Sequence, residues 1–106
     1  MRIALAIGAA LIALALLPAA AQAKNCGRVP LGEGSATTAG TVITRNLSCQ
    51  LGISILDRWA VRADKVCNRG ICPVLRVKGY RCTQSRTKPT GRCVKGRRVA
   101  RVEFGL

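Results

Sequence analysis

The chain has 106 residues, with 18 lysine or arginine residues against only four acidic ones, so its formal net charge is +14. It contains no histidine, which removes the usual general base of enzymes and a common zinc ligand. This length allows one small domain with a limited core. The composition therefore argues against catalysis and metal binding and favours association with anionic partners.

The first 23 residues have the three-part organisation of a secretory signal peptide. Arg2 precedes an apolar run over Ile3–Leu17, and the small-x-small sequence Ala21-Gln22-Ala23 provides a cleavage site. We expect cleavage after Ala23, which leaves a secreted or extracytoplasmic chain without a transmembrane span. The alternative is an uncleaved anchor, because residues 3–21 could cross a thin bilayer as a helix.

All six cysteines follow this segment, at Cys26, Cys49, Cys67, Cys72, Cys82 and Cys93. An even number in a short exported chain predicts three disulfides, each contributing about 2–4 kcal/mol to stability. Such crosslinks compensate for a core that is too small to hold a chain of this length folded. Zinc is not expected, because the sequence has neither histidine nor a Cys-x-x-Cys pair.

The first part of the mature chain is predicted to be an N-terminal anchor and flexible loop over residues 24–40. Its second half, LGEGSATTAG, is small, polar and rich in glycine. Thr41–Arg45 then predicts a strand, because β-branched residues suit a pleated, half-buried surface. Asn46 or Ser48 can cap a helix, since their side-chain oxygens accept hydrogen bonds from its first free amides.

An amphipathic helix is predicted after this cap, ending between Asp64 and Val66. Small and apolar residues recur at steps of three and four and form one stripe, comprising Cys49, Gly52, Ile53, Leu56, Ala60 and Ala63. Trp59 lies beside the stripe and is expected to be the largest contribution of the helix to the core.

The remainder predicts a strand over Val74–Cys82, with a bulge at Gly79, and two short strands joined at Lys95-Gly96. In the last strand, Ala100, Val102 and Phe104 share one face, and Val99, Arg101 and Glu103 share the other. The predicted fold is α+β: one helix packed on a small antiparallel sheet in the order β-α-β-β-β, over residues 41–106.

This layout favours one set of cystine pairs among the fifteen that six cysteines allow. Cys67 and Cys72 enclose a four-residue turn and can form a local bridge. Cys82 and Cys93 fall on neighbouring strands and are expected to pair across the sheet, which leaves Cys26 to tie the N-terminus to the helix through Cys49.

The run from VITRNLSC through the helix to GYRC and RCVKGRRVARVEF resembles a set of small exported cysteine-rich proteins of high-GC bacteria. The shared features are a cysteine that opens a helix, a later aromatic-x-Cys strand and a terminal Cys-x-x-Gly hairpin. The resemblance covers about residues 41–104 and implies an exported α+β domain, without implying an activity. The CNRGIC pair is additional to the shared pattern.

No enzymatic activity is expected from the remaining polar residues. The four carboxylates are Glu33, Asp57, Asp64 and Glu103. The two helical aspartates are about 10 Å apart, which is two helical turns. They are better suited to salt bridges with the nearby basic residues, which are Arg58, Arg62 and Lys65.

Positive charge is the strongest functional feature. The densest cluster falls on the C-terminal strands and their loop, and its members are the candidate polyanion-binding residues: Arg81, Arg86, Lys88, Arg92, Lys95, Arg97, Arg98 and Arg101. Such a field attracts anionic polysaccharide, wall polymers or an anionic lipid surface. Dedicated nucleic-acid binding is not expected, because the single Trp, Tyr and Phe fit a core better than a stacking platform. Charge that serves only solubility is the alternative.

Two further functions stay open. An extracellular protease inhibitor would present the 83–92 loop and offer the Arg86–Thr87 bond to a trypsin-like enzyme, whereas the alternative is an ordinary solvated hairpin loop. A membrane-active antimicrobial protein would use the charge to disrupt anionic bilayers. The chain lacks the amphipathic helix with bulky aromatic residues on one face that usually marks such proteins.

Overall fold

The computed structural model describes residues 22–32, 38–67 and 72–105, so most of the predicted signal peptide lies outside the described residues. The described ranges form one helix and six strands. Their bounds are β1 (Lys24–Leu31), β2 (Thr38–Arg45), α2 (Cys49–Val66), β3 (Leu75–Val77), β4 (Tyr80–Gln84), β5 (Thr90–Lys95) and β6 (Arg98–Phe104). The predicted α+β class, with one helix on an antiparallel sheet, is confirmed.

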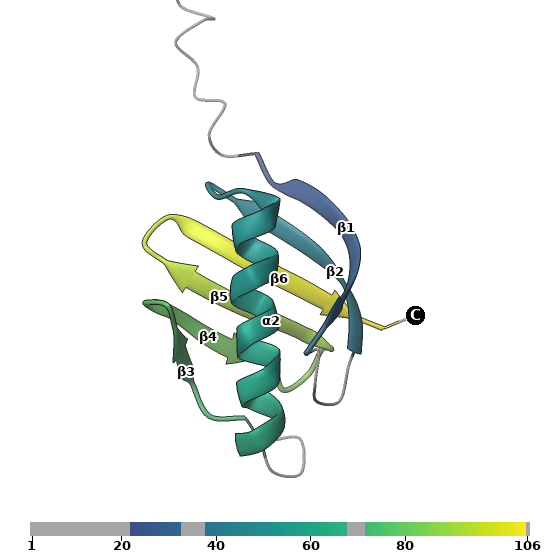
Figure 1. The fold of residues 1–106 in the computed structure, drawn as a ribbon, viewed down its shortest axis with the longest axis vertical. Helices are drawn as coiled ribbons and strands as arrows, with labels where there is room; N and C mark the ends of the chain where they lie inside the picture. The colour runs from purple at the N-terminus through teal and green to yellow at the C-terminus, as the bar shows by residue number, and fades with distance from the viewer. Residues whose placement is uncertain (1–21, 33–37, 68–71, 106) are drawn as a thin grey trace, which may run out of the picture.

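The strands form a single sheet in the order β1-β2-β6-β5-β4-β3, and every neighbouring pair is antiparallel. The helix α2 lies across one face of this sheet, and the strands pass behind it in Figure 1. The pairing of β2 with β6 joins segments from the two ends of the described chain. Because the helix covers only one face, the other face is open in the described part of the chain.

The core lies between α2 and the sheet. Ser48 caps the helix, and its Oγ accepts from the amide of Leu51 at 3.2 Å. The residues that α2 buries are Gly52, Ile55, Leu56, Trp59 and Ala63. The buried stripe is therefore rotated slightly from the predicted one, since Ile53 and Ala60 are only partly buried. Trp59 is the largest buried side chain, as predicted.

Two elements differ from the prediction. Lys24–Leu31 is strand β1 rather than only an anchor, because it pairs along β2 at the edge of the sheet, where Pro30 needs no hydrogen-bonding partner. The predicted strand over Val74–Cys82 is two strands. Lys78 and Gly79 both have positive φ, 51° and 82°, which is the backbone of a tight hairpin turn rather than of a bulge. The order is thus β-β-α-β-β-β-β.

All three predicted disulfides are present. Cys26 pairs with Cys49, Cys67 with Cys72, and Cys82 with Cys93. The ladder shifts register between Asn25 and Gly27, which makes Cys26 the extra residue of a bulge and places it on the helix side. Three disulfides in so small a domain indicate an oxidising, extracytoplasmic setting.

The helical aspartates do not form the expected salt bridges. Asp57 instead accepts a hydrogen bond from the backbone amide of Gly32 at 2.8 Å, which ties the end of β1 to the helix. Arg62, one of the expected partners, donates to the backbone carbonyl of Arg76. In the described part of the chain, the salt bridge that forms joins Arg101 and Glu103 at 3.3 Å.

Candidate anion-binding face

The open face of the sheet carries six exposed arginines. Residues that pair directly across an antiparallel ladder project to the same side, so the register assigns each strand residue to one face. The buried residues Val102, Cys93 and Cys82 identify the helix side of β6, β5 and β4. By this assignment, the arginines on the open side, here called the arginine face, are Arg28, Arg45, Arg76, Arg81, Arg92 and Arg101.

Five of these arginines form a continuous band across five strands. Arg76 pairs directly with Arg81, and Arg92 pairs directly with Arg101. Arg81 pairs with Val94, so it is the diagonal neighbour of Arg92. Arg45 pairs with Val99 and is in the same way the diagonal neighbour of Arg101. With strands about 4.8 Å apart, the band is about 19 Å long.

The sixth arginine lies apart from this band. Arg28 is on the edge strand β1 and donates from Nη1 to the carbonyl oxygen of Gly105 at 2.6 Å. This hydrogen bond ties the residue that follows β6 to β1, across the intervening strand β2. The role of Arg28 is therefore explained by this structural contact, and the candidate anion-binding surface is the band of the other five arginines.

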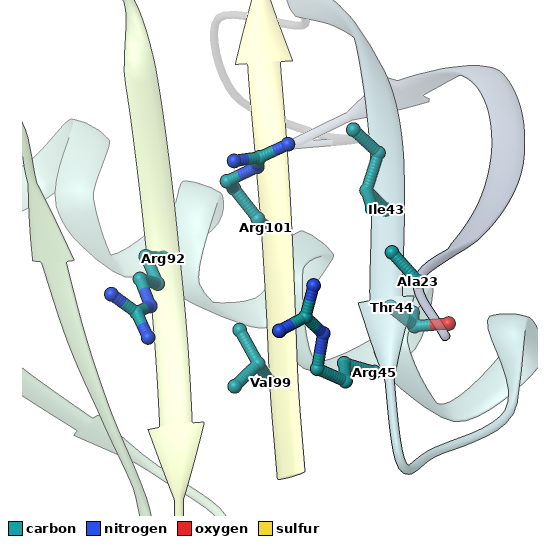
Figure 2. Close-up of a pocket in the computed structure, with 7 residues that line it drawn as sticks. All are labelled: Ala23, Ile43, Thr44, Arg45, Arg92, Val99 and Arg101. Carbon is teal, nitrogen blue, oxygen red and sulfur yellow. The ribbon is translucent and has the colours of Figure 1, made fainter. Parts of the chain in front are cut away.

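The centre of the band contains a hollow. Figure 2 shows Arg45, Arg101 and Arg92 on the neighbouring strands β2, β6 and β5, with Val99 between them and the Arg45 side chain reaching toward β6. The hollow has a volume of about 210 Å³, and its lining residues are Ala23, Ile43, Thr44, Arg45, Arg92, Val99 and Arg101. Ile43 and Val99 are half-buried, so the hollow combines guanidinium groups with small aliphatic walls.

The charge of this face is poorly compensated. Within the described sheet, the acidic residue on the arginine face is Glu103, which already forms a salt bridge with Arg101. Like charges placed directly opposite each other on neighbouring strands are destabilising, and Arg92 with Arg101 is such a pair. Two directly opposed arginine pairs on one open face lower the stability of the sheet. Solubility alone does not require this arrangement, because dispersed charges would serve solubility equally well.

Arginine and lysine are distributed differently over the molecule. The basic residues of the open face are all arginines, whereas the five lysines lie elsewhere: Lys24, Lys65, Lys78, Lys88 and Lys95. Lys95, for example, places its ammonium 5.8 Å from the centre of the Tyr80 ring. The guanidinium group presents a planar fork of donors that matches phosphate and carboxylate oxygens in pairs. The face is therefore suited to oxyanions.

The structure divides the eight candidate residues predicted from the sequence. Arg81, Arg92 and Arg101 lie on the arginine face. Arg86 and Lys88 are in the β4–β5 loop at one end of the strands. The remaining three lie at the other end, where β5 turns into β6: Lys95, Arg97 and Arg98. The predicted cluster is thus not one surface.

Three arginines of the face were missed from the sequence. Arg28, Arg45 and Arg76 come from β1, β2 and β3, which are distant from the C-terminal cluster along the chain. The alternation in TVITR and LRV already places Arg45 and Arg76 opposite their buried neighbours. The alternation could not show that Arg45 lies beside β6 or that Arg76 lies beside β4.

The β4–β5 loop gives less support to protease inhibition. Ser85 Oγ accepts from the amides of Thr87 and Lys88 at 3.3 and 3.2 Å, and the amide of Ser85 donates to the carbonyl of Thr90 at 3.0 Å. The Arg86–Thr87 bond therefore lies in a folded turn. A protease binds an extended segment, because the segment adds to its own strands as it enters the active site.

Comparison with known protein families, with curated proteins and with solved structures finds no match to this chain. Within the described ranges, the structure contains no helix with the length and apolarity that crossing a bilayer requires.

Proposed function

We propose that this protein is an exported, noncatalytic binding module whose arginine face lies against an anionic polysaccharide or wall polymer of the cell envelope. The observation that carries the proposal is the directly opposed pair Arg92 and Arg101 at the centre of a continuous arginine band. A linear polyanion laid across the strands would meet one guanidinium at each strand and relieve the repulsion between them.

A polymer is favoured over a lipid surface by the character of the face. Membrane-surface binding usually combines basic residues with bulky apolar side chains that enter the bilayer. The aliphatic residues beside the band, Ile43, Val94 and Val99, are half-buried, and the aromatic residues Trp59 and Tyr80 are buried on the helix side. The face therefore offers charge and hydrogen bonds, but little apolar surface to insert.

Export by a cleaved signal peptide is part of the proposal. The disulfides support an oxidising compartment, and β1 begins at Lys24, directly after the expected cleavage site. N-terminal sequencing of the protein recovered from the native envelope should therefore begin at Lys24.

The experiment that tests binding compares two double variants with equal loss of charge. Arg81→Gln with Arg92→Gln removes charge from the arginine face, whereas Arg58→Gln with Lys65→Gln removes it from exposed positions on α2. Retention on immobilised polygalacturonate should decrease steeply as the salt concentration rises. In the variant of the arginine face, the slope of log affinity against log salt concentration should be smaller in magnitude by about two. Equal losses in both variants would mean that net charge alone governs binding.

A further inference from the structure

We propose that the hollow between Arg45, Arg92 and Arg101 is a subsite for a phosphomonoester carried on a glycan. This inference rests on the proposed function and names the chemical group that the centre of the face selects. The hollow is lined by arginines from three neighbouring strands, and the Arg45 side chain reaches over β6 toward Val99 (Figure 2).

The charge of the hollow favours a doubly charged anion. Three arginines line it, and Glu103 offsets one of them through its contact with Arg101 at 3.3 Å. These side chains leave a local excess of two positive charges, and the α-amine that the expected cleavage frees on Lys24, next to Ala23 in the lining, adds a further one. A phosphomonoester carries about −1.5 to −2 at neutral pH, whereas a uronate carboxylate or a sulfate ester carries a single negative charge. Among these groups, the phosphomonoester therefore offsets the largest part of the excess with one group.

The shape and walls of the hollow favour a phosphate that is attached to a sugar. The hollow of about 210 Å³ has Ala23 as part of its wall, and the expected cleavage removes this residue, so the hollow of the mature protein is more open on that side. A water molecule takes about 30 Å³ in the liquid, so the hollow has room for a phosphoryl group and part of the ring that carries it. Ile43 and Val99 provide half-buried aliphatic contacts for the ring carbons. Arginines from three strands line the hollow, and a guanidinium group can bind two oxygens of a tetrahedral group at once.

The test titrates three glucose derivatives that differ only in their anionic group: glucose 6-phosphate, glucose 6-sulfate and glucuronate. Binding is followed by amide and guanidinium resonances of the full mature protein at constant ionic strength. At pH 7 we expect glucose 6-phosphate to bind about five to ten times more tightly than the other two, since it alone is a dianion. Equal affinities for the three sugars would overturn the proposal.

The pH dependence provides a second readout, because the dianion forms with a pKa near 6. Glucose 6-phosphate affinity should decrease by about five- to tenfold from pH 7 to pH 5. The chain has no histidine. The charged groups that line the hollow or contact its arginines are Arg45, Arg92, Arg101 and Glu103. The nearest others are Arg81, one strand further along the band, and the α-amine of Lys24, which is free after the expected cleavage. Inorganic sulfate stays dianionic over this interval and controls for them. A decrease for sulfate as large as that for glucose 6-phosphate would contradict the proposal.

Variants separate this inference from the proposed function. Arg45→Gln and Arg92→Gln should each weaken glucose 6-phosphate binding about tenfold, whereas Arg81→Gln, on the band but outside the hollow, should leave it within twofold while lowering retention on the polymer. If polymer retention depends on the face but no sugar phosphate binds, the subsite fails and the proposed function stands. If neither binds, both fail.

Discussion

Replacing Arg92 with glutamine should make the folded protein more stable while it weakens anion binding. Arg92 lies directly opposite Arg101 on the open face, and Arg81 is its diagonal neighbour. Directly opposed residues have Cβ atoms about 5 Å apart, and two unit charges at that separation would repel by about 0.8 kcal/mol in water, which is an upper value for two guanidinium groups that turn apart. Salt at physiological concentration roughly halves this value. Arg92→Gln should therefore raise the free energy of unfolding by about 0.5 kcal/mol, because it removes this repulsion without breaking the Arg101–Glu103 salt bridge.

Thermal unfolding with the disulfides intact measures this change. A gain of about 0.5 kcal/mol corresponds to a rise of about 2–4 °C in Tm for a domain of this size. The gain should be largest near 0.01 M salt and nearly absent near 1 M, where the Debye length is only about 3 Å. Arg58→Gln on the exposed side of α2 is the matched control. A decrease in the stability of Arg92→Gln at low salt would refute the argument that the arginine face is maintained against a cost in stability.

Two further predictions concern the scaffold that positions the face. Gly91→Ala should destabilise the fold by about 1–3 kcal/mol, because a Cβ at Gly91 would overlap the six-membered ring of Trp59. Urea unfolding measures this loss, and an unchanged midpoint would contradict the packing of Trp59 on Gly91. Removing the buried cross-strand bridge by Cys82→Ala with Cys93→Ala should cost about 2–4 kcal/mol in the same assay, and a loss well below this range would show that the disulfide is not a main support of the sheet.

Local patterns in the sequence were sufficient for the helix, its cap and the cystine pairs. The step of three and four residues from Cys49 to Ala63 predicts α2, and Ser48, one of the two caps that the sequence offers, is where it begins. The Cys82–Cys93 bridge follows from the hairpin that places these residues opposite each other. These features depend on neighbours in the chain or on one hairpin, and Cys26–Cys49 is the pair that remains once the other two are assigned.

The sequence could not supply the features that depend on strand order. β1 contains Gly27 and Pro30 and no clear alternation, so only its pairing along β2 makes it a strand. The arginine band requires the non-local pairing of β2 with β6, which brings Arg45 beside the C-terminal strands. For the same reason the sequence placed the candidate site around the C-terminal hairpin and its loop, whereas the structure spreads it across five strands.

Arginine footprinting tests the central claim most directly. The protein would be modified with phenylglyoxal, which reacts with exposed guanidinium groups, in the presence and absence of saturating polygalacturonate, and the modified peptides quantified by mass spectrometry. The account predicts protection of the band, Arg45, Arg76, Arg81, Arg92 and Arg101, while Arg58, Arg86, Arg97 and Arg98 stay reactive. Uniform protection of all arginines, or protection confined to the loop and turn residues, would contradict it.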